Sequence, residues 1–173
     1  MIINIEEIGD EGLHIHTTRN PEWLTNIPEI NDYSSNLSVL GSIEMDFIVN
    51  KILNEISVTG DIKCVINCMC SRCIEPVRIS LNPEINLLLS PGDADKDNES
   101  NIDFETYNEE EDSIDLSDYL RERIAISIPV KVICDSDCKG LCSKCGTNLN
   151  YGSCNCESEW VDPRFAKLKN LKV

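Results

Sequence analysis

The stretch that decides the fold is Ser42-Ile43-Glu44-Met45-Asp46-Phe47-Ile48-Val49, in which apolar and polar residues alternate. The same period returns after Gly60-Asp61 in Ile62, Cys64, Ile66 and Cys68, and again after Pro76 in Val77, Ile79, Leu81, Ile85, Leu87 and Leu89. Alternation of period two is typical of strands that bury one face, and the short polar breaks favour hairpin connections. The sequence therefore predicts an antiparallel β-meander over residues 38–89.

One helix is expected beside this sheet, over residues 115–128. Asp115 can cap its first turn, and Asp118 adds negative charge there, where the helix dipole favours it. Residues at three- and four-residue spacings form one buried face, namely Leu116, Tyr119, Leu120, Ile124 and Ser127. Pro129 prevents continuation. The expected fold class is α+β: an antiparallel β-meander sheet with one main helix, followed by a small Cys-rich tail like a zinc ribbon.

All ten cysteines fall into two groups, one within residues 64–73 and one within residues 134–156. Cys142-x₂-Cys145-Gly146 has the shape of a zinc knuckle, in which two thiolates grip one metal ion and the glycine lets the backbone fold back. A first site is expected to comprise Cys142, Cys145, Cys154 and Cys156. A second site would join Cys70 and Cys73, at a hairpin turn, to Cys134 and Cys138.

Two alternatives concern these thiols. Cys134 and Cys138 compete for places in the first site, so one site could form instead of two. The pairs Cys68-x-Cys70 and Cys154-x-Cys156 also offer the chemistry of a redox-switched zinc protein or chaperone, since such pairs can release zinc and form disulfides. Cys64 has the position of a strand residue and is expected in the core.

The zinc (Zn²⁺) is expected to be structural. The tail has few large apolar residues, so burial alone cannot order it, whereas a structural zinc site contributes on the order of 10–16 kcal/mol. Four protein ligands leave no open coordination position, which argues against a hydrolytic metal. The chain also has no Gly-rich phosphate loop and no G-x-S-x-G elbow, and its two histidines, His14 and His16, lie far from any nucleophile motif. The protein is predicted not to be an enzyme.

The net charge of −16 is unevenly distributed along the 173 residues. Residues 1–129, the expected acidic body, carry −18, whereas residues 130–173, the expected metal-binding tail with a short helix over 162–171, carry +2. Residues 91–112 hold ten acids and one base, which favours a solvated loop. An acidic body suits a basic protein partner, while the weakly basic tail leaves RNA binding open.

No apolar run is long enough for a membrane span, and no secretory signal is visible, so a cytoplasmic location without membrane contact is expected. In a reducing compartment, closely spaced cysteines are more often metal ligands than disulfides.

Several motifs together resemble the YceD family, named for large ribosomal RNA subunit accumulation. They are Cys70-Ser-Arg-Cys73-Ile-Glu-Pro, the acidic loop, Ile114-Asp-Leu-Ser-Asp-Tyr-Leu-Arg-Glu-Arg-Ile124, Ile128-Pro129, and the tail stretch Cys138-Lys-Gly-Leu-Cys-x₂-Cys-Gly-x-Asn-Leu-Asn150 with Asp162-Pro-Arg164. The resemblance spans roughly residues 36–173 and is to the metal-rich version of the family. It implies a cytoplasmic bacterial or plastid factor that supports large-subunit ribosomal RNA, and its gene is often a neighbour of one for a large-subunit ribosomal protein. Such a ribosomal protein is an example of the basic partner that the acidic body suits. The matching positions are Cys70, Arg72, Cys73, Glu122, Pro129, Gly140, Leu141, Cys142, Cys145, Gly146, Asn148 and Asn150, and the resemblance implies no catalytic residue among them.

Overall fold

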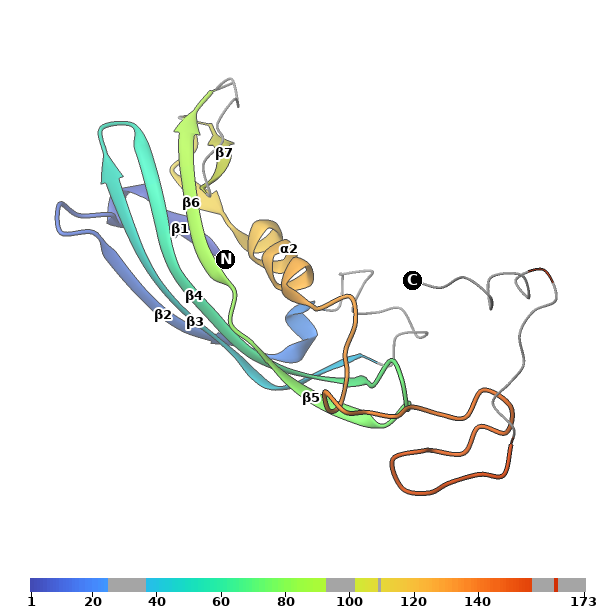
Figure 1. The fold of residues 1–173 in the computed structure, drawn as a ribbon. Helices are drawn as coiled ribbons and strands as arrows, with labels where there is room; N and C mark the ends of the chain where they lie inside the picture. Colours follow the sequence, from blue (N-terminus) through green and yellow to red (C-terminus); the bar gives the residue numbers. More distant parts are fainter. Residues whose placement is uncertain (25–36, 93–101, 109, 157–163, 165–173) are drawn as a thin grey trace.

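A curved six-stranded sheet forms the body of the protein. The structure, a computed structural model, describes residues 1–24, 37–92, 102–108, 110–156 and 164. Figure 1 shows the long strands arching around the helix α2 (Ser117–Ser127), which lies on their inner side. The strands are β2 (Leu13–Arg19), β3 (Ser38–Ile52), β4 (Glu55–Met69), β5 (Pro76–Leu81), β6 (Glu84–Pro91) and β7 (Asp103–Tyr107).

The antiparallel meander predicted from the alternation is present in β3, β4, β5 and β6. β3 and β4 are each 15 residues long and pair antiparallel along most of their length. The other edge of β4 pairs with β5 near the Cys70 end and with β6 near the β3–β4 turn. β5 and β6 therefore act as one strand that is interrupted at Asn82-Pro83.

The sequence favours a loop over the whole acidic segment 91–112, but residues 103–107 form the strand β7. This strand pairs parallel with β6, so the sheet is mixed rather than purely antiparallel. The Tyr107 hydroxyl donates to the carbonyl of Asn54 at 2.7 Å, and its ring packs against the core. These long-range contacts outweigh the acidic composition that favoured a loop. Residues 93–101 lie outside the described residues.

The core lies between the inner face of the sheet and α2. Alternate residues of β3 are at most 1% exposed, namely Ile43, Met45, Phe47 and Val49. Leu120 and Ile124 of α2 are fully buried against the same cluster. At Gly60 of β4 the strands approach so closely that a Cβ atom would lie 2.9 Å from Phe47 Cα and would also meet the carbonyl oxygen of Asp46. The one-sided burial is what the period-two pattern predicted.

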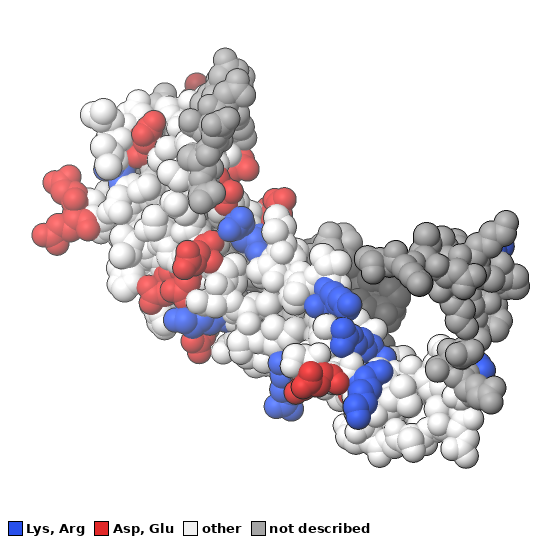
Figure 2. Space-filling model, viewed as in Figure 1, with Lys and Arg blue, Asp and Glu red and all other residues white. Residues whose placement is uncertain are grey.

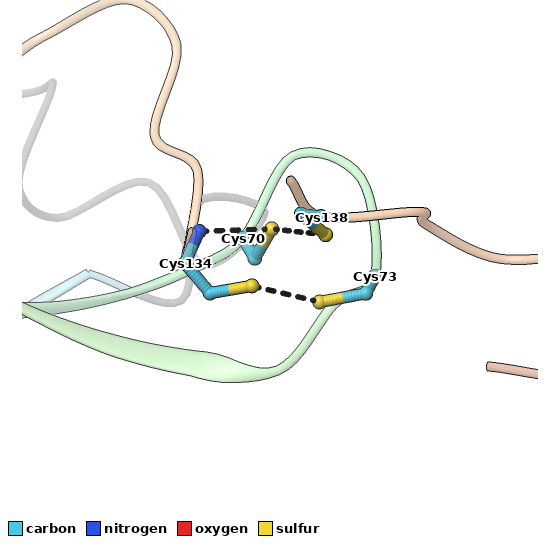
Figure 3. Close-up of side chains that lie close together, drawn as sticks. All are labelled: Cys70, Cys73, Cys134 and Cys138. Atoms are coloured by element: carbon cyan, nitrogen blue, oxygen red, sulfur yellow. Dashed lines mark hydrogen bonds between the residues drawn. The ribbon is translucent and has the colours of Figure 1, made fainter. Parts of the chain in front are cut away.

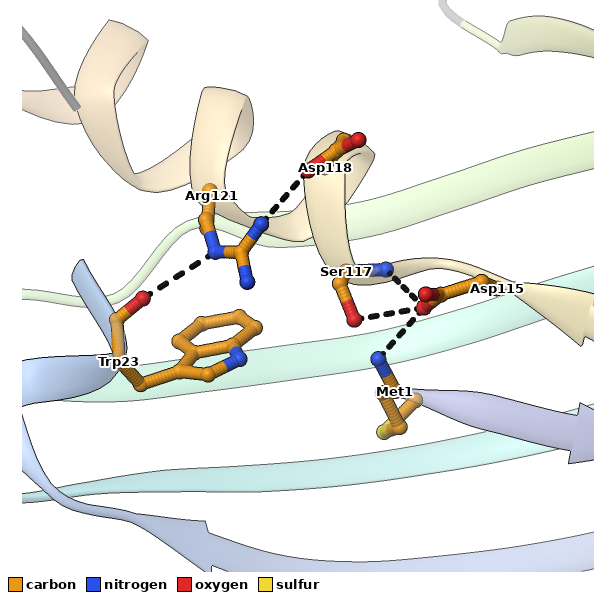
Figure 4. A network of polar contacts seen from close by, with 6 residues as sticks. All are labelled: Met1, Trp23, Asp115, Ser117, Asp118 and Arg121. Atoms are coloured by element: carbon orange, nitrogen blue, oxygen red, sulfur yellow. Dashed lines mark hydrogen bonds and ion pairs between the residues drawn. The ribbon is translucent and has the colours of Figure 1, made fainter. Parts of the chain in front are cut away.

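The N-terminal segment closes one end of this core. β1 (Ile2–Asn4) pairs antiparallel with β8 (Ser113–Asp115). The short 3₁₀ turn η1 (Ile5–Glu7) follows β1 in the chain, and a second one, η2 (Pro21–Leu24), packs beside β3. Arg121 of α2 donates to the carbonyl of Trp23 at 3.1 Å, and its guanidinium lies 5.1 Å from the centre of the indole ring (Figure 4). This contact ties η2 to the helix.

The side chain of Asp115 accepts a hydrogen bond from the first residue of α2, but Asp115 lies one residue before the N-cap position. Leu116 occupies the N-cap position, while the Asp115 carboxylate accepts hydrogen bonds from the Ser117 backbone at 2.9 Å and from the Met1 amino nitrogen at 2.7 Å (Figure 4). The hydrogen bonds from Met1 and then Ser117 hold the pKa of this carboxyl well below its usual range. The predicted helix is thus present, and Asp115 satisfies the first N–H of its first turn.

The tail extends from the β4–β5 end of the sheet (Figure 1). Between residues 130 and 156, all of which are described, β-type pairing is limited to one isolated bridge between Leu141 and Asn148. The expected C-terminal helix over 162–171 falls almost wholly outside the described residues. No helix within the described ranges is long and apolar enough to cross a membrane.

Candidate metal centre

Two short turns with the same backbone geometry carry four of the cysteines. In the first, Cys70-Ser-Arg-Cys73, the N–H of Ile74 donates to the Cys70 carbonyl at 3.0 Å, and the N–H of Cys70 donates to the Glu75 carbonyl at 2.8 Å. In the second, Cys142-Ser-Lys-Cys145, the corresponding bonds from Gly146 and to Thr147 are both 2.9 Å long. The chain therefore contains a small structural repeat, Cys-Ser-Arg/Lys-Cys, that the sequence analysis did not identify.

The residue after each second cysteine has a positive φ angle. Gly146 takes φ 74°, as the glycine of the predicted knuckle should, and Ile74 takes φ 62° at the equivalent position. A β-branched residue rarely adopts this conformation, because its side chain crowds the backbone. The first turn thus has knuckle geometry despite lacking the glycine that marks a knuckle in sequence.

The inner cluster consists of Cys70, Cys73, Cys134 and Cys138. It joins the β4–β5 turn to the segment that follows α2, and its four Sγ atoms all lie within 4.8 Å of one another (Figure 3). The Sγ atoms of Cys70 and Cys138 are 3.9 Å apart, and those of Cys73 and Cys134 are 3.5 Å apart. Four sulfurs at about 2.3 Å from a tetrahedral zinc ion would be separated by roughly 3.8 Å, so these spacings suit such an ion.

The outer cluster consists of Cys142, Cys145, Cys154 and Cys156. Its Sγ atoms also lie within 4.8 Å of one another. All four are at least partly accessible and Cys145 is exposed, whereas Cys70, Cys73 and Cys138 of the inner cluster are buried. Each of the two ligand sets expected from the sequence is thus gathered in space, and both have a donor set compatible with zinc.

Each cluster contains two thiols whose pKa is lowered and two whose pKa is raised. Burial raises the pKa of Cys70, but backbone N–H groups, first that of Arg72, outweigh burial and lower it to about 6. Thr147 lowers the pKa of Cys145 to about 6, whereas sharing a proton with Cys138 raises that of Cys134 to about 12, and Cys145 likewise raises that of Cys156 to about 12. Four neighbouring thiols cannot all ionise without a cation, so a metal ion would displace the remaining protons.

Four residues that matched the family motif but had no assigned contact attach the tail to the first turn. The Arg72 guanidinium donates to the Cys138 carbonyl at 2.9 Å, and the Arg72 backbone carbonyl accepts from the Leu141 N–H at 3.0 Å. Gly140 lies so close to Arg72 that a Cβ atom would be 3.0 Å from the Arg72 carbonyl oxygen. Asn148 donates to Glu75 at 3.1 Å, and Asn150 donates to Cys138 Sγ at 3.4 Å.

The remaining cysteines and the histidines belong to neither cluster. Cys64 lies in the sheet core, as expected, and Cys68 is buried with its Sγ 3.7 Å from the Val77 carbonyl. The exposed His14 and His16 both contact the carboxylate of Asp46, at 2.6 and 3.2 Å. These hydrogen bonds, that of His14 first, lower the pKa of Asp46.

Comparison with known families identifies the family of the chain. The family model described as large ribosomal RNA subunit accumulation protein YceD matches residues 58–172, which include most of β4, all of α2 and all ten cysteines. The chain belongs to the YceD family. The resemblance expected from its motifs is therefore confirmed, although the matched YceD region begins later than residue 36.

The chain is similar to plant and bacterial proteins, and the names of the plant relatives agree with the YceD assignment. A chloroplastic YCED homolog 1 of Arabidopsis thaliana, named as a large ribosomal RNA subunit accumulation protein, is 30% identical over 169 residues, which is 83% of this chain and 51% of the relative. A protein of the same name from Zea mays is 28% identical, covering 63% of this chain and 46% of the relative. An uncharacterised Mycobacterium tuberculosis protein is 29% identical, and the match covers 75% of this chain and 61% of the relative.

The chain spans about half to three fifths of the length of these three relatives. No solved structure matches it. The description of the YceD family names accumulation of ribosomal RNA and no catalytic activity.

Proposed function

We propose that this protein is a non-enzymatic, cytoplasmic factor that supports accumulation of large-subunit ribosomal RNA, with structural zinc in its Cys-rich tail. The YceD family match over residues 58–172 is the observation that carries this proposal. The names of the plant relatives, which refer to accumulation of the same RNA, support it. No catalytic residue is needed for such a role.

The arrangement of the thiols supports a structural rather than a catalytic metal. Each cluster offers four sulfur ligands, which would fill a tetrahedral coordination shell and leave no position for water or substrate. The inner cluster would fasten the tail to the β4–β5 turn, and the outer cluster would close the loop 142–156. The β4–β5 turn and the tail would then together form a zinc-ribbon-like unit whose two knuckles belong to different sites.

Charge favours a basic protein as the direct partner, such as a large-subunit ribosomal protein. Residues 1–129 carry −18, and Figure 2 shows acidic side chains spread over the sheet-and-helix body. A hollow of about 460 Å³ beside the inner cluster is lined by Glu75, Asp135 and Asp137, among others. These features attract cationic surfaces and repel a phosphate backbone.

The tail offers the weaker case for direct RNA binding. Figure 2 shows basic side chains gathered where the tail joins the sheet, and Lys139 and Lys144 line a hollow of about 500 Å³ beside the outer cluster. However, zinc with four thiolates has a formal charge of about −2. Two such centres would carry about −4 together, which more than cancels the net charge of +2 on residues 130–173, and this is why we favour protein over RNA.

Complementation in cells that lack this protein tests the proposal. The ratio of large- to small-subunit ribosomal RNA is expected to fall in those cells and to recover with the wild-type chain. Cys142→Ser/Cys145→Ser should rescue poorly, whereas Cys64→Ala, which removes a thiol outside both clusters, should rescue as well as wild type. An unchanged RNA ratio in the depleted cells would contradict the proposed role.

Affinity purification of the tagged chain, with and without nuclease, separates the two classes of partner. Retention of a ribosomal protein after nuclease supports direct protein binding. Loss of every partner after nuclease would instead assign the contact to RNA.

A redox-switched zinc protein is the second candidate, and the exposure of Cys145 in the outer cluster favours it. Oxidation would release zinc from the pair Cys154-x-Cys156 first. The other pair considered, Cys68-x-Cys70, is less suitable because Cys68 lies outside both clusters. Thiol and zinc content would be measured before and after mild peroxide, and equal rescue of ribosomal RNA by both forms would refute this candidate.

A further inference from the structure

The two clusters are only three residues apart in the chain, and the loop closed by the outer cluster folds back onto the inner one. Cys138 belongs to the inner cluster and Cys142 to the outer cluster. The loop between Cys142 and Cys154 returns at Asn148–Asn150, where the N–H of Leu149 donates to the Gly140 carbonyl at 2.9 Å. The segment that ends in the outer cluster therefore passes directly beside an inner-cluster ligand.

Asn150 makes the contact between the loop and the inner cluster. Its side-chain oxygen accepts the N–H of Lys139 at 2.7 Å, and its side-chain nitrogen donates to Cys138 Sγ at 3.4 Å. A backbone N–H can only donate, so it fixes the amide oxygen toward Lys139 and aims the amide N–H at the sulfur. The side chain is thus oriented to stabilise negative charge on Cys138.

Asn148 holds Asn150 in place and ties the same loop to the first turn. Its side-chain oxygen accepts the N–H of Asn150 at 3.0 Å, and its side-chain nitrogen donates to Glu75 Oε1 at 3.1 Å. Glu75 in turn accepts the N–H of Cys70 through its backbone carbonyl. The loop is therefore connected to two ligands of the inner cluster, Cys70 and Cys138, without supplying a ligand itself.

We propose that the two cysteine clusters bind metal cooperatively, because the outer metal closes the loop that places Asn150 against Cys138. This inference rests on the zinc sites of the proposed function. With the outer cluster empty, the loop loses its closure and Asn150 is no longer held at the inner ligand. By linkage, filling either site raises the affinity of the other by the same factor. Hydrogen bonds to metal ligands are typically worth about 10–100-fold in metal affinity, which sets the expected factor.

Titration of the metal-free full chain with Zn²⁺, in competition with a chromophoric chelator, measures this coupling. Wild type should bind two ions, whereas Cys154→Ser/Cys156→Ser should bind one ion, at the inner cluster, with about 10–100-fold lower affinity than that site has in wild type. Asn150→Leu should still bind two ions but should weaken the inner site by a similar factor. Asn86→Leu, at an exposed asparagine of β6, should change neither affinity.

The combined variant with all three substitutions completes the test. Asn150→Leu should have no further effect on inner-site affinity when the outer cluster cannot close, because the two changes break the same connection. Two ions that bind wild type independently, or an Asn150→Leu variant with wild-type affinity, would overturn the coupling while leaving the zinc sites intact. A chain that binds no zinc would overturn both the coupling and the structural metal of the proposed function.

Discussion

Removal of metal is expected to unfold the tail while the sheet and α2 stay folded. Among the residues that the structure describes, the core that packs β3, β4 and α2 contains none beyond Ile128, and the inner cluster forms a separate small group with Val77, Ile133 and Leu141. Among the apolar side chains of residues 130–156, only Val132 and Cys138 are buried. The body therefore has its own source of stability, and the tail has very little.

The effect of metal removal can be estimated from the free energies that oppose and favour ordering of the 23 residues from Cys134 to Cys156. Fixing them costs roughly 35 kcal/mol at about 1.5 kcal/mol per residue. Hydrogen bonds between the tail and the first turn, such as those joining Arg72 to Cys138 and to Leu141, return about 1 kcal/mol each, or roughly 6 kcal/mol together. Two zinc sites at about 10–16 kcal/mol each supply the remainder, so the tail is ordered with metal and not without it.

Hydrogen–deuterium exchange before and after chelation provides the assay. In the metal-free chain the amides of Leu141, Cys142, Gly146 and Leu149, all hydrogen-bonded in the folded tail, should exchange at the rate of an unfolded peptide. The exchange rates of the β3 and β4 amides should change less than about tenfold on chelation, which limits the loss of local stability there to roughly 1.4 kcal/mol. Retained protection in the tail, in protein shown by elemental analysis to hold no metal, would refute the reasoning.

Three further predictions concern the knuckles, the sheet and the thiol protons. Gly146→Ala should weaken zinc binding at the outer cluster by about 1–2 kcal/mol, because alanine disfavours a φ angle of 74°. Ile74→Gly should relieve the corresponding strain in the first turn, so the zinc affinity of the inner cluster should stay equal or rise. Competition with a chelator measures both affinities. Gly60→Ala should lower the free energy of unfolding by about 1–3 kcal/mol in urea titrations, because its Cβ would meet the β3 backbone. Zinc binding at pH 7 should release at least two protons per site, because the thiols of the tail are unfolded without metal, have an ordinary pKa of about 8.5 and are protonated at pH 7. Zinc affinity should therefore fall as pH falls below about 8.5, since protons compete with zinc for the sulfurs. Calorimetry in buffers of different ionisation enthalpy counts the released protons, and release of fewer than two protons per site would contradict the assignment.

The sheet and α2 could be predicted from the sequence because burial on one face leaves a local pattern. Residues 43–49 alternate, and Leu120 and Ile124 recur at helical spacing, so each element shows its inner face in its own sequence. β7 could not be predicted in this way. Its pairing depends on β6 and its aromatic contact on Asn54, both distant in the chain, while its own composition is acidic.

The members of the candidate sites could be predicted, but the residues that position them could not. The Cys-x₂-Cys spacing marks a knuckle locally, and the break between two alternating runs places Cys70 and Cys73 at a hairpin turn. Asn148 and Asn150 are polar residues in a loop, with no pattern that assigns them a contact. Only the folded loop shows that they connect the outer cluster to the inner one.

The position of the clusters bears on where a partner would bind. An acidic body and a more basic tail are joined at the inner cluster, so their relative placement depends on the contacts among Cys70, Cys73, Cys134 and Cys138. A partner that contacts both parts would recognise a surface that exists only when this cluster is closed. A partner that contacts the body alone would bind equally well after chelation, because the core of β3, β4 and α2 includes none of the described tail residues 130–156. Metal dependence of partner binding therefore locates the functional surface: loss of binding on chelation places it across the junction, and undiminished binding places it on the acidic sheet and helix.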